Sequence, residues 1–242
     1  MKTLIRNTLI LIAGLNSGML FAADDIEELQ KAIAKRLPQV EVTRIDKTPV
    51  NGIYQVIVGP QVVYMTRDAK YMIDGDLVDL STRKNFTEDA KAAIRKSEID
   101  EFGEKDMVVY TPKTVKHTIT VVTDVNCPYC RRLHSEMPKY MENGIKVRYI
   151  FMPLKGTDDI NKTISVWCAD DRNAALDIAK AGGEVEAKKC DNPILKHMEL
   201  ARKLGVRGTP AIILENGDML PGYVPVDKLV TQLNTLKVSA AQ

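Results

Sequence analysis

Apolar positions recur with two different periods in the first part of the chain. In residues 24–37 they follow helical spacing, and Pro38 ends the run. The period then changes to two, which indicates short strands at 40–45, 52–58, 62–65, 71–73 and 77–80. Asn-Gly, Gly-Pro and Asp-Gly dipeptides between these runs supply turns. Residues 23–82 are therefore expected to form an α+β domain with one helix and a small, mostly antiparallel sheet.

In the second part, residues 107–242, strand and helix patterns alternate, which predicts an α/β domain. The expected strands are 117–124, 145–152, 211–215 and 218–220, and the expected helices are 128–142, 158–181, 194–204 and 226–237. Pro138 lies inside the first of these helices and should kink it. Residues 83–106 are expected to form a linker helix with Thr87 as its N-cap. Its thin apolar content predicts a mostly solvated helix.

The first 22 residues have the pattern of a cleaved secretory signal. Lys2 and Arg6 form a basic start, and the apolar stretch that follows is too short to span a bilayer. Small residues then arrive at Ala22 and Ala23. Export would place the four cysteines of the chain in an oxidising compartment. The alternative is an N-terminal anchor that is retained.

Charge and hydropathy narrow the range of partners. Without Lys2 and Arg6 the formal net charge of +2 falls to about zero, so no nucleic-acid partner is expected. No later apolar run is long enough to cross a membrane, so no stable membrane insertion is expected. The small sheet of residues 23–82 has edges that pairing with a second copy would cover. A homodimer is the prediction, and a monomeric accessory domain is the alternative.

The segment Cys127-Pro-Tyr-Cys130 carries the strongest chemical signal. It follows an apolar strand and opens a helix, so its first sulfur lies where a helix N-terminus favours negative charge. A thiolate there can attack a disulfide to form a mixed disulfide, which a second thiol can release. Pro128 suits the first helical turn, where its missing N–H costs nothing. We interpret Cys127 as the catalytic nucleophile and Cys130 as the resolving thiol, with no cofactor.

Other interpretations of the cysteines stay open. Cys127 and Cys130 have the spacing of half a zinc site, which Cys168 and Cys190 could complete, although no metal is the expectation. The first pair could also be an inert disulfide. The second pair would most simply bond to each other and staple a helical insertion, contributing about 3 kcal/mol, unless they form a second redox relay or free thiols. His134 either influences the thiolate or, as we favour, lies at the surface.

The strand, the Cys-Pro-Tyr-Cys helix and the later Gly208-Thr209-Pro210 turn together resemble the thioredoxin fold. The resemblance implies a cis-proline at Pro210 that lies against the dithiol. It also makes Thr209, Pro210, Pro128 and Tyr129 the substrate-binding residues. Beyond this unit the chain is similar to the DsbC/DsbG family of periplasmic thiol:disulfide interchange proteins, in segments 118–121, 123–130, 133–134, 147–150, 166–168, 204–211 and 220–223.

This family resemblance implies a periplasmic disulfide isomerase. It implies a V-shaped homodimer joined through a cystatin-like N-terminal dimerisation domain, with a thioredoxin-fold catalytic domain that carries a helical insertion. Its substrates would be misfolded, disulfide-containing exported proteins, and a DsbD-type membrane reductant would keep its dithiol reduced. One departure is Pro-Tyr between the cysteines, where the best-known isomerases have Gly-Tyr. The alternatives are therefore a DsbG-like reductase of sulfenylated single cysteines and a holdase chaperone.

Overall fold

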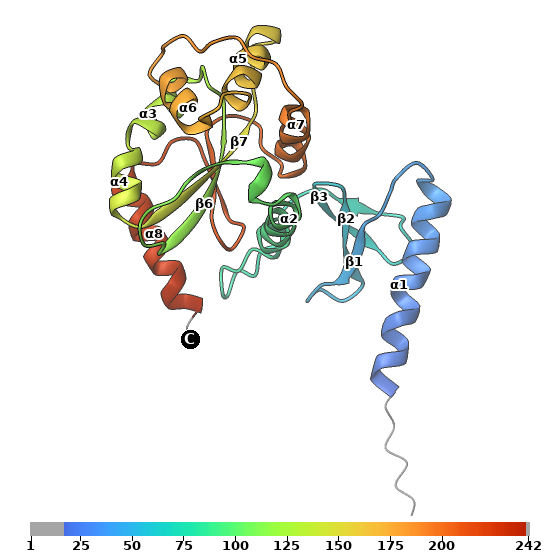
Figure 1. Cartoon of the computed structure of the whole chain (residues 1–242). Helices are drawn as coiled ribbons and strands as arrows, with labels where there is room; N and C mark the ends of the chain where they lie inside the picture. Colours follow the sequence, from blue (N-terminus) through green and yellow to red (C-terminus); the bar gives the residue numbers. More distant parts are fainter. Residues whose placement is uncertain (1–16, 241–242) are drawn as a thin grey trace, which may run out of the picture. The chain divides into compact units, whose positions relative to one another are not determined.

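The computed structural model describes the backbone of residues 17–240, and the side chains of residues 25–236 (Figure 1). Most of the predicted signal segment, residues 1–16, lies outside the described residues. The chain divides into two compact units, which we describe separately. One unit contains residues up to 58 and residues 63–74, and the other contains residues 59–62 and the chain from residue 75 onward.

The N-terminal unit pairs one helix with a small sheet. It contains α1 (Ser17–Arg36), β1 (Arg44–Lys47), β2 (Ile53–Val58), β3 (Gln61–Thr66) and β4 (Met72–Ile73), with the strands in that spatial order. The pairs β1–β2 and β3–β4 are antiparallel. The apolar face of α1, with Leu29 and Ile33, packs against Val56, Val63 and Met65 of the sheet.

The predicted strand at 77–80 is wrong. Only Val78 makes an isolated bridge, and its partner is Asn85. The backbone N–H of Phe86 donates to the carbonyl of Leu77. The segment therefore closes a loop on the residues that precede the next helix, which satisfies its polar backbone groups outside the sheet.

The helix α2 (Phe86–Phe102) differs from the prediction in two ways. Its N-cap is Asn85, whose side-chain oxygen accepts from the backbone N–H groups of Thr87 and Glu88, so Thr87 is not the cap. The helix is also not mostly solvated. Ile99 joins an apolar cluster, and the buried Arg95 donates to the carbonyl of Gly217 at 3.3 Å. Small residues and an arginine of this helix thus pack on a core. A count of its apolar residues therefore underestimates how much of the helix is buried.

The larger unit is built on a five-stranded mixed sheet with the order β5-β7-β6-β8-β9. The strands are β5 (Val108–Tyr110), β6 (His117–Thr123), β7 (Ile145–Phe151), β8 (Ala211–Ile213) and β9 (Met219–Pro221). β6 and β7 are parallel, and the other pairs are antiparallel. The sequence pattern indicated four of these strands and missed β5.

Helices cover both faces of this sheet. They are α3 (Pro128–Ser135), α4 (Met137–Glu142), α5 (Thr157–Trp167), α6 (Arg172–Lys180), α7 (Ile194–Lys203) and α8 (Val226–Ala240), and a 3₁₀ turn spans Glu104–Asp106. The predicted helix 128–142 breaks at Glu136, two residues before Pro138, because proline cannot continue the hydrogen-bond ladder. The region 158–181 forms two helices rather than one.

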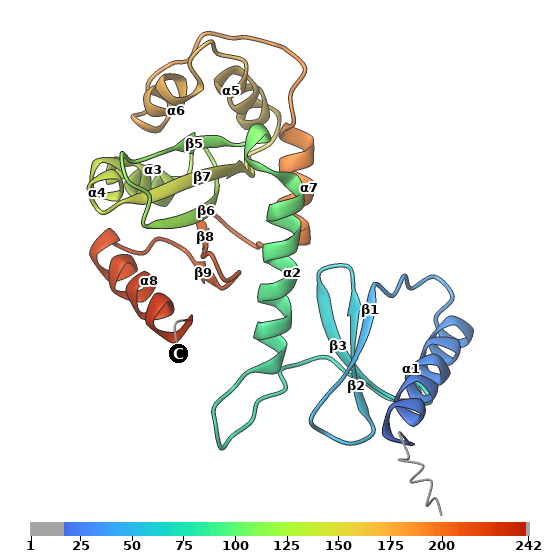
Figure 2. The same ribbon diagram turned by 60° about the horizontal axis from the view of Figure 1, so that its bottom comes forward.

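Alternate residues of the central strands separate the core into two layers. Val121 of β6 belongs to the cluster under α3, α4, α6 and α8, whereas Val122 belongs to the cluster under α2 and α7. The helices α2 and α7 lie side by side on that second face (Figure 2). This two-layered packing holds the carboxyl end of β6, where the dithiol begins, on a rigid scaffold.

His197 is a polar residue in the middle of this packing. Its ring stacks on Phe151 and meets Trp167 and Phe102 edge-on. Nδ1 accepts the backbone N–H of Phe151 at 3.1 Å, and Nε2 donates to the carbonyl of Asp106. Burial lowers the pKa of His197 from 6.5 to about 4, so the folded protein holds this ring neutral.

We expect His197 to make the protein sensitive to acid. An unfolded histidine takes up a proton near pH 6.5, while the folded one resists until about pH 4. Its contribution is therefore fully present above pH 6.5 and is lost as the pH falls toward 4, a loss of about 3 kcal/mol in total. Urea unfolding at a series of pH values measures this slope. His197→Asn should be less stable at neutral pH and show a shallower slope, and an unchanged slope would contradict the assignment.

Candidate functional site

The two cysteines of the predicted dithiol lie at the junction of β6 and α3. Cys127 is the N-cap of α3 with an extended backbone (φ −71°, ψ 124°), and Pro128 occupies the first helical turn. Both thiols are free in the structure. Cys127 is partly exposed, whereas the side chain of Cys130 is only 1% exposed. The geometry therefore offers an incoming molecule the first sulfur and hides the second.

A turn distant in sequence lies against the first sulfur. The peptide bond between Thr209 and Pro210 is cis, and Pro210 leads into β8, which pairs with β6. The Cys127 Sγ donates to the carbonyl oxygen of Thr209 at 3.3 Å. The structure thus brings Thr209 and Pro210 to the dithiol. Tyr129, which follows Pro128, is 62% exposed beside it.

The environment separates the two thiols in acidity. Burial alone raises the pKa of Cys127, but hydrogen bonds led by the backbone N–H of Cys130 outweigh it and lower the pKa below its usual value. Burial raises the pKa of Cys130, and the influences that oppose it are weaker. At neutral pH the exposed sulfur is therefore the better thiolate, and the buried one retains its proton.

Sequence reasoning missed Lys180, the last residue of α6. Its side chain is buried, and its Nζ donates to Thr123 Oγ1 and to the carbonyl of Asp124, each at 2.7 Å. Both acceptors belong to the end of β6, directly before the dithiol segment. The spacing of Lys180 from Leu176 places it on the apolar face of the helix. This position is the signal in the sequence that could have revealed its burial.

The favoured interpretation of His134 as a surface residue is wrong. Its side chain is buried, with Nδ1 at 3.0 Å from the Tyr149 hydroxyl and Nε2 at 2.8 Å from Asp177 Oδ1. Tyr110 donates to the same Asp177 carboxylate at 2.6 Å. Burial lowers the pKa of His134. The ring therefore belongs to a hydrogen-bonded cluster that ties α3, α6, β5 and β7 together.

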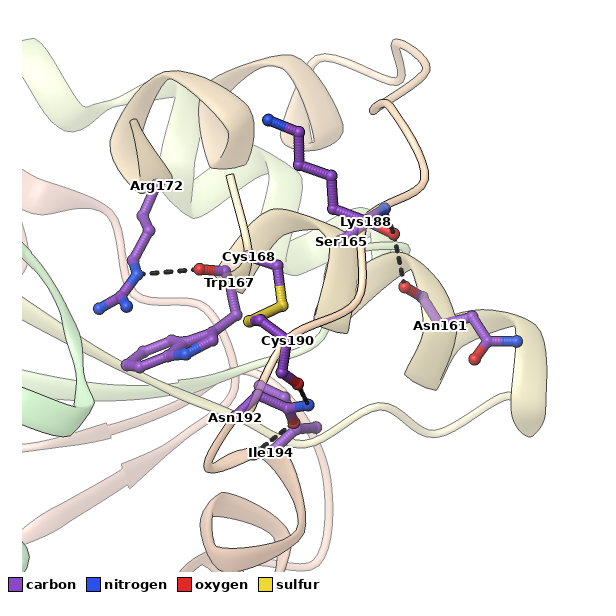
Figure 3. Close-up of a disulfide and its surroundings, with 9 residues drawn as sticks. All are labelled: Asn161, Ser165, Trp167, Cys168, Arg172, Lys188, Cys190, Asn192 and Ile194. Atoms are coloured by element: carbon purple, nitrogen blue, oxygen red, sulfur yellow. Dashed lines mark hydrogen bonds between the residues drawn. A yellow bond between two sulfur atoms is a disulfide. The ribbon is translucent and has the colours of Figure 1, made fainter. Parts of the chain in front are cut away.

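The structure joins Cys168 and Cys190 in a disulfide with a Cα–Cα distance of 5.7 Å (Figure 3). It ties the end of α5 to the segment that leads into α7, on either side of α6. The carbonyl of the adjacent Trp167 accepts from Arg172, and Cys190 accepts from Asn192. Because both sulfurs are bonded to each other, they do not complete a zinc site with the dithiol.

Among the described helices, none has the length and apolar character that a membrane crossing requires.

A dithiol that begins a helix, a cis-proline turn against its first sulfur and a mixed sheet covered by helices define a thioredoxin-like oxidoreductase. Comparison with family models agrees. Residues 103–237 match the thioredoxin-like domain, and residues 20–88 match the N-terminal domain of disulfide bond isomerase proteins. The fold class expected from the sequence is confirmed.

Relatives with similar sequences carry one name. The thiol:disulfide interchange protein DsbC of Escherichia coli is 38% identical over 85% of this chain and 86% of its own length. That of Salmonella typhimurium is 39% identical over 88% of each chain. A solved disulfide interchange protein from Neisseria gonorrhoeae has 28% identity and a TM-score of 0.49, over 54% of this chain and 96% of that chain. The chain belongs to the DsbC family and is a thiol–disulfide oxidoreductase.

Proposed function

We propose that this protein is a homodimeric, exported disulfide isomerase in which Cys127 attacks non-native disulfides of folding proteins. The observation that carries the proposal is the asymmetry of the dithiol. The sulfur of Cys127 is accessible and its pKa is lowered, whereas Cys130 is buried and its pKa is raised. Membership of the DsbC family supports isomerisation as the net reaction.

The chemistry is a series of exchanges of sulfur partners. The Cys127 thiolate attacks one sulfur of a substrate disulfide, a new S–S bond forms, and the other substrate sulfur leaves as a thiolate. The freed thiolate attacks a different disulfide of the substrate, which forms a new S–S bond and expels another thiolate. That thiolate attacks the substrate sulfur of the mixed disulfide, and Cys127 leaves as a thiolate with the substrate rearranged. If rearrangement stalls, Cys130 loses its proton and attacks Cys127 Sγ. The enzyme then leaves as a disulfide and the substrate as a dithiol.

Four residues around Cys127 would bind the substrate chain. The carbonyl of Thr209 lies against the sulfur, and Pro210 follows it into β8, so an extended substrate could pair with this backbone as an added strand. Pro128 and the exposed Tyr129 lie beside the sulfur as the two residues that directly follow Cys127 in the chain. Backbone pairing of this kind accepts many sequences, which suits an enzyme that acts on varied misfolded proteins.

The N-terminal unit supports homodimer formation. Its last strand, β4, is an edge of the four-stranded sheet. Tyr71, Met72 and Ile73 expose 61%, 59% and 54% of their side chains there. An apolar edge strand is a site at which another chain pairs. A second copy is the partner that the family resemblance implies, and it would place two dithiols in one assembly.

The proposed compartment is the periplasm, which residues 1–22 would address as a cleaved signal. Reduced Cys127 is needed for every attack, so an oxidising compartment requires a source of electrons. We propose a membrane reductant of the DsbD type in that role. It would reduce a Cys127–Cys130 disulfide by the same exchange, with its own dithiol becoming oxidised.

Trapping of the mixed disulfide tests this function. Cys130→Ala is expected to accumulate a covalent adduct with a scrambled, multi-disulfide substrate, because the internal route of release is absent. Non-reducing electrophoresis followed by mass spectrometry should locate the adduct on Cys127. The double variant with Cys127→Ala serves as the control and should form none. An adduct on Cys168 or Cys190, or one as scarce as in the wild type, would overturn the assignment.

A further inference from the structure

The helical insertion contributes a buried cation to the region of the dithiol. Lys180 is only 4% exposed, although lysine side chains are rarely enclosed without a partner. No ion pair to a carboxylate is found for it among the described residues, and two neutral oxygens of Thr123 and Asp124 hold its Nζ. A buried ammonium is usually stabilised by an ion pair with a fixed opposite charge, and this arrangement does not provide one.

The resolving thiol becomes an anion when it ionises, and the charge of Lys180 favours that form. Thr123 and Asp124 also interact with the Cys130 thiol and favour its charged form. Burial lowers the pKa of Lys180 to about 8, and Cys130 is foremost among the charges that oppose this, ahead of Asp124 and Cys127. Lys180 and Cys130 therefore share a small buried region at the end of β6.

Other charged groups around Lys180 are already engaged. The Asp124 carboxylate accepts from the backbone N–H groups of Asn126 and Leu154. Arg131 donates to the side chain of Asn126 and repels Lys180 weakly. On its own helix, Asp177 is bound by His134 and Tyr110, and His134 is held neutral near physiological pH by burial.

We propose that Lys180 is a positioning residue for the resolving step. Its buried ammonium, held by Thr123 and Asp124, stabilises the Cys130 thiolate that attacks the mixed disulfide. This rests on the proposed roles of Cys127 and Cys130. In the step, Cys130 gives up its proton, its sulfur bonds to Cys127 Sγ, and the bond between Cys127 and the substrate breaks. The electron pair leaves on the substrate sulfur, which takes up a proton.

Lys180 affects the balance between rearrangement of the bound substrate and release of the substrate in reduced form. A buried thiol without a nearby cation would ionise only at high pH, and the mixed disulfide would persist. Lys180 shortens that lifetime and favours release of the substrate in reduced form. The disulfide Cys168–Cys190 brackets the segment that carries α6, so this cation is held on a covalently closed loop.

The first experiment measures Cys130 directly in a Cys127→Ser background, where it is the one free thiol. The ultraviolet absorbance of its thiolate is followed against pH in three proteins of this background, one with Lys180 unchanged, one with Lys180→Gln and one with Lys180→Met. We expect the pKa of Cys130 to rise by about one unit or more in both variants. Lys188→Met removes a partly exposed lysine of the same insertion, which pairs with Asp170, and should leave the titration unchanged.

The second experiment measures release from a preformed mixed disulfide between Cys127 and a chromogenic thiol. Each unit of rise in the Cys130 pKa should slow release about threefold, since the loss of thiolate exceeds the gain in nucleophilicity. The ratio of wild-type to Lys180→Gln rates should shrink as the pH rises above about 8, where Lys180 itself loses its proton. The initial attack by Cys127 should change less than the release.

Lys180→Gln separates a charge effect from a structural one, because it keeps a hydrogen-bond donor. If Lys180→Met is unstable while Lys180→Gln titrates and resolves as the wild type does, Lys180 only fills space and the proposal is wrong. A raised Cys130 pKa with an unchanged release rate would also overturn it. The titration is independent of isomerase activity, so a failure of the proposed function would leave that result readable.

Discussion

Replacing Cys127 by alanine is expected to reduce the recovery of a scrambled, multi-disulfide enzyme to the uncatalysed rate. Cys127 is the accessible member of the dithiol, and its lowered pKa makes it the more readily ionised of the two thiols. Cys130 is too deeply buried to replace it, and Cys168 and Cys190 are bonded to each other. The assay follows regained activity of the scrambled substrate in a redox buffer.

The same Cys127→Ala protein should keep its fold and any capacity to hold unfolded chains. Suppression of aggregation of a cysteine-free unfolded protein measures this second property and should equal that of the wild type. Suppression without unscrambling would show that only the exchange reaction needs the thiol. Unscrambling at the wild-type rate by Cys127→Ala would sink the enzymatic assignment of this residue.

Removing the N-terminal unit should abolish most isomerisation but spare simple reduction. A fragment of residues 75–242 retains the larger unit, including α2, except for residues 59–62. A fragment that begins at residue 107 would lose Ile99 and Arg95, which pack into that unit. Two dithiols in one dimer keep a second thiol at high effective concentration for a bound substrate, so isomerisation should fall by about tenfold or more. Reduction of a small disulfide needs one site and should persist.

A full-length variant controls for the deletion. Met72→Lys with Ile73→Lys places two charges on the exposed edge strand β4, where they oppose pairing with another chain. Sedimentation should show a monomer, and its isomerase activity should fall as that of the fragment does. Equal isomerisation by the dimer and by either monomeric form would refute the need for two sites.

Sequence patterns predicted the parts of the fold that depend on local spacing. The change of period near Pro38 separated a helix from short strands, and the alternation after His117 identified the larger sheet. Errors arose where tertiary contacts override local patterns. Residues 77–80 alternate like a strand but bond to the loop before α2. β5 was missed, although β8 and β9, which are equally short, were indicated.

The candidate site was partly predictable because some of its features depend on local signals in the sequence. The spacing of Cys127 and Cys130 and the turn at Pro210 are local signals. His134 was misjudged because nothing in its neighbourhood predicts that Asp177 and Tyr149, from two other elements, would enclose it. Lys180 was missed because a lysine at the end of a helix usually favours solvent.

The sequence by itself placed two cysteines at the start of a helix and predicted a redox dithiol there, since three-residue spacing and a helix N-terminus lie within one segment. It also indicated the order of most elements, because hydrophobic periodicity is local. Only the tertiary structure decided which sulfur is exposed, that the Thr209 carbonyl accepts from Cys127, and that Lys180 lies buried at the end of β6, where it donates to Thr123. These depend on segments far apart in the chain, and packing of the complete fold brings them together.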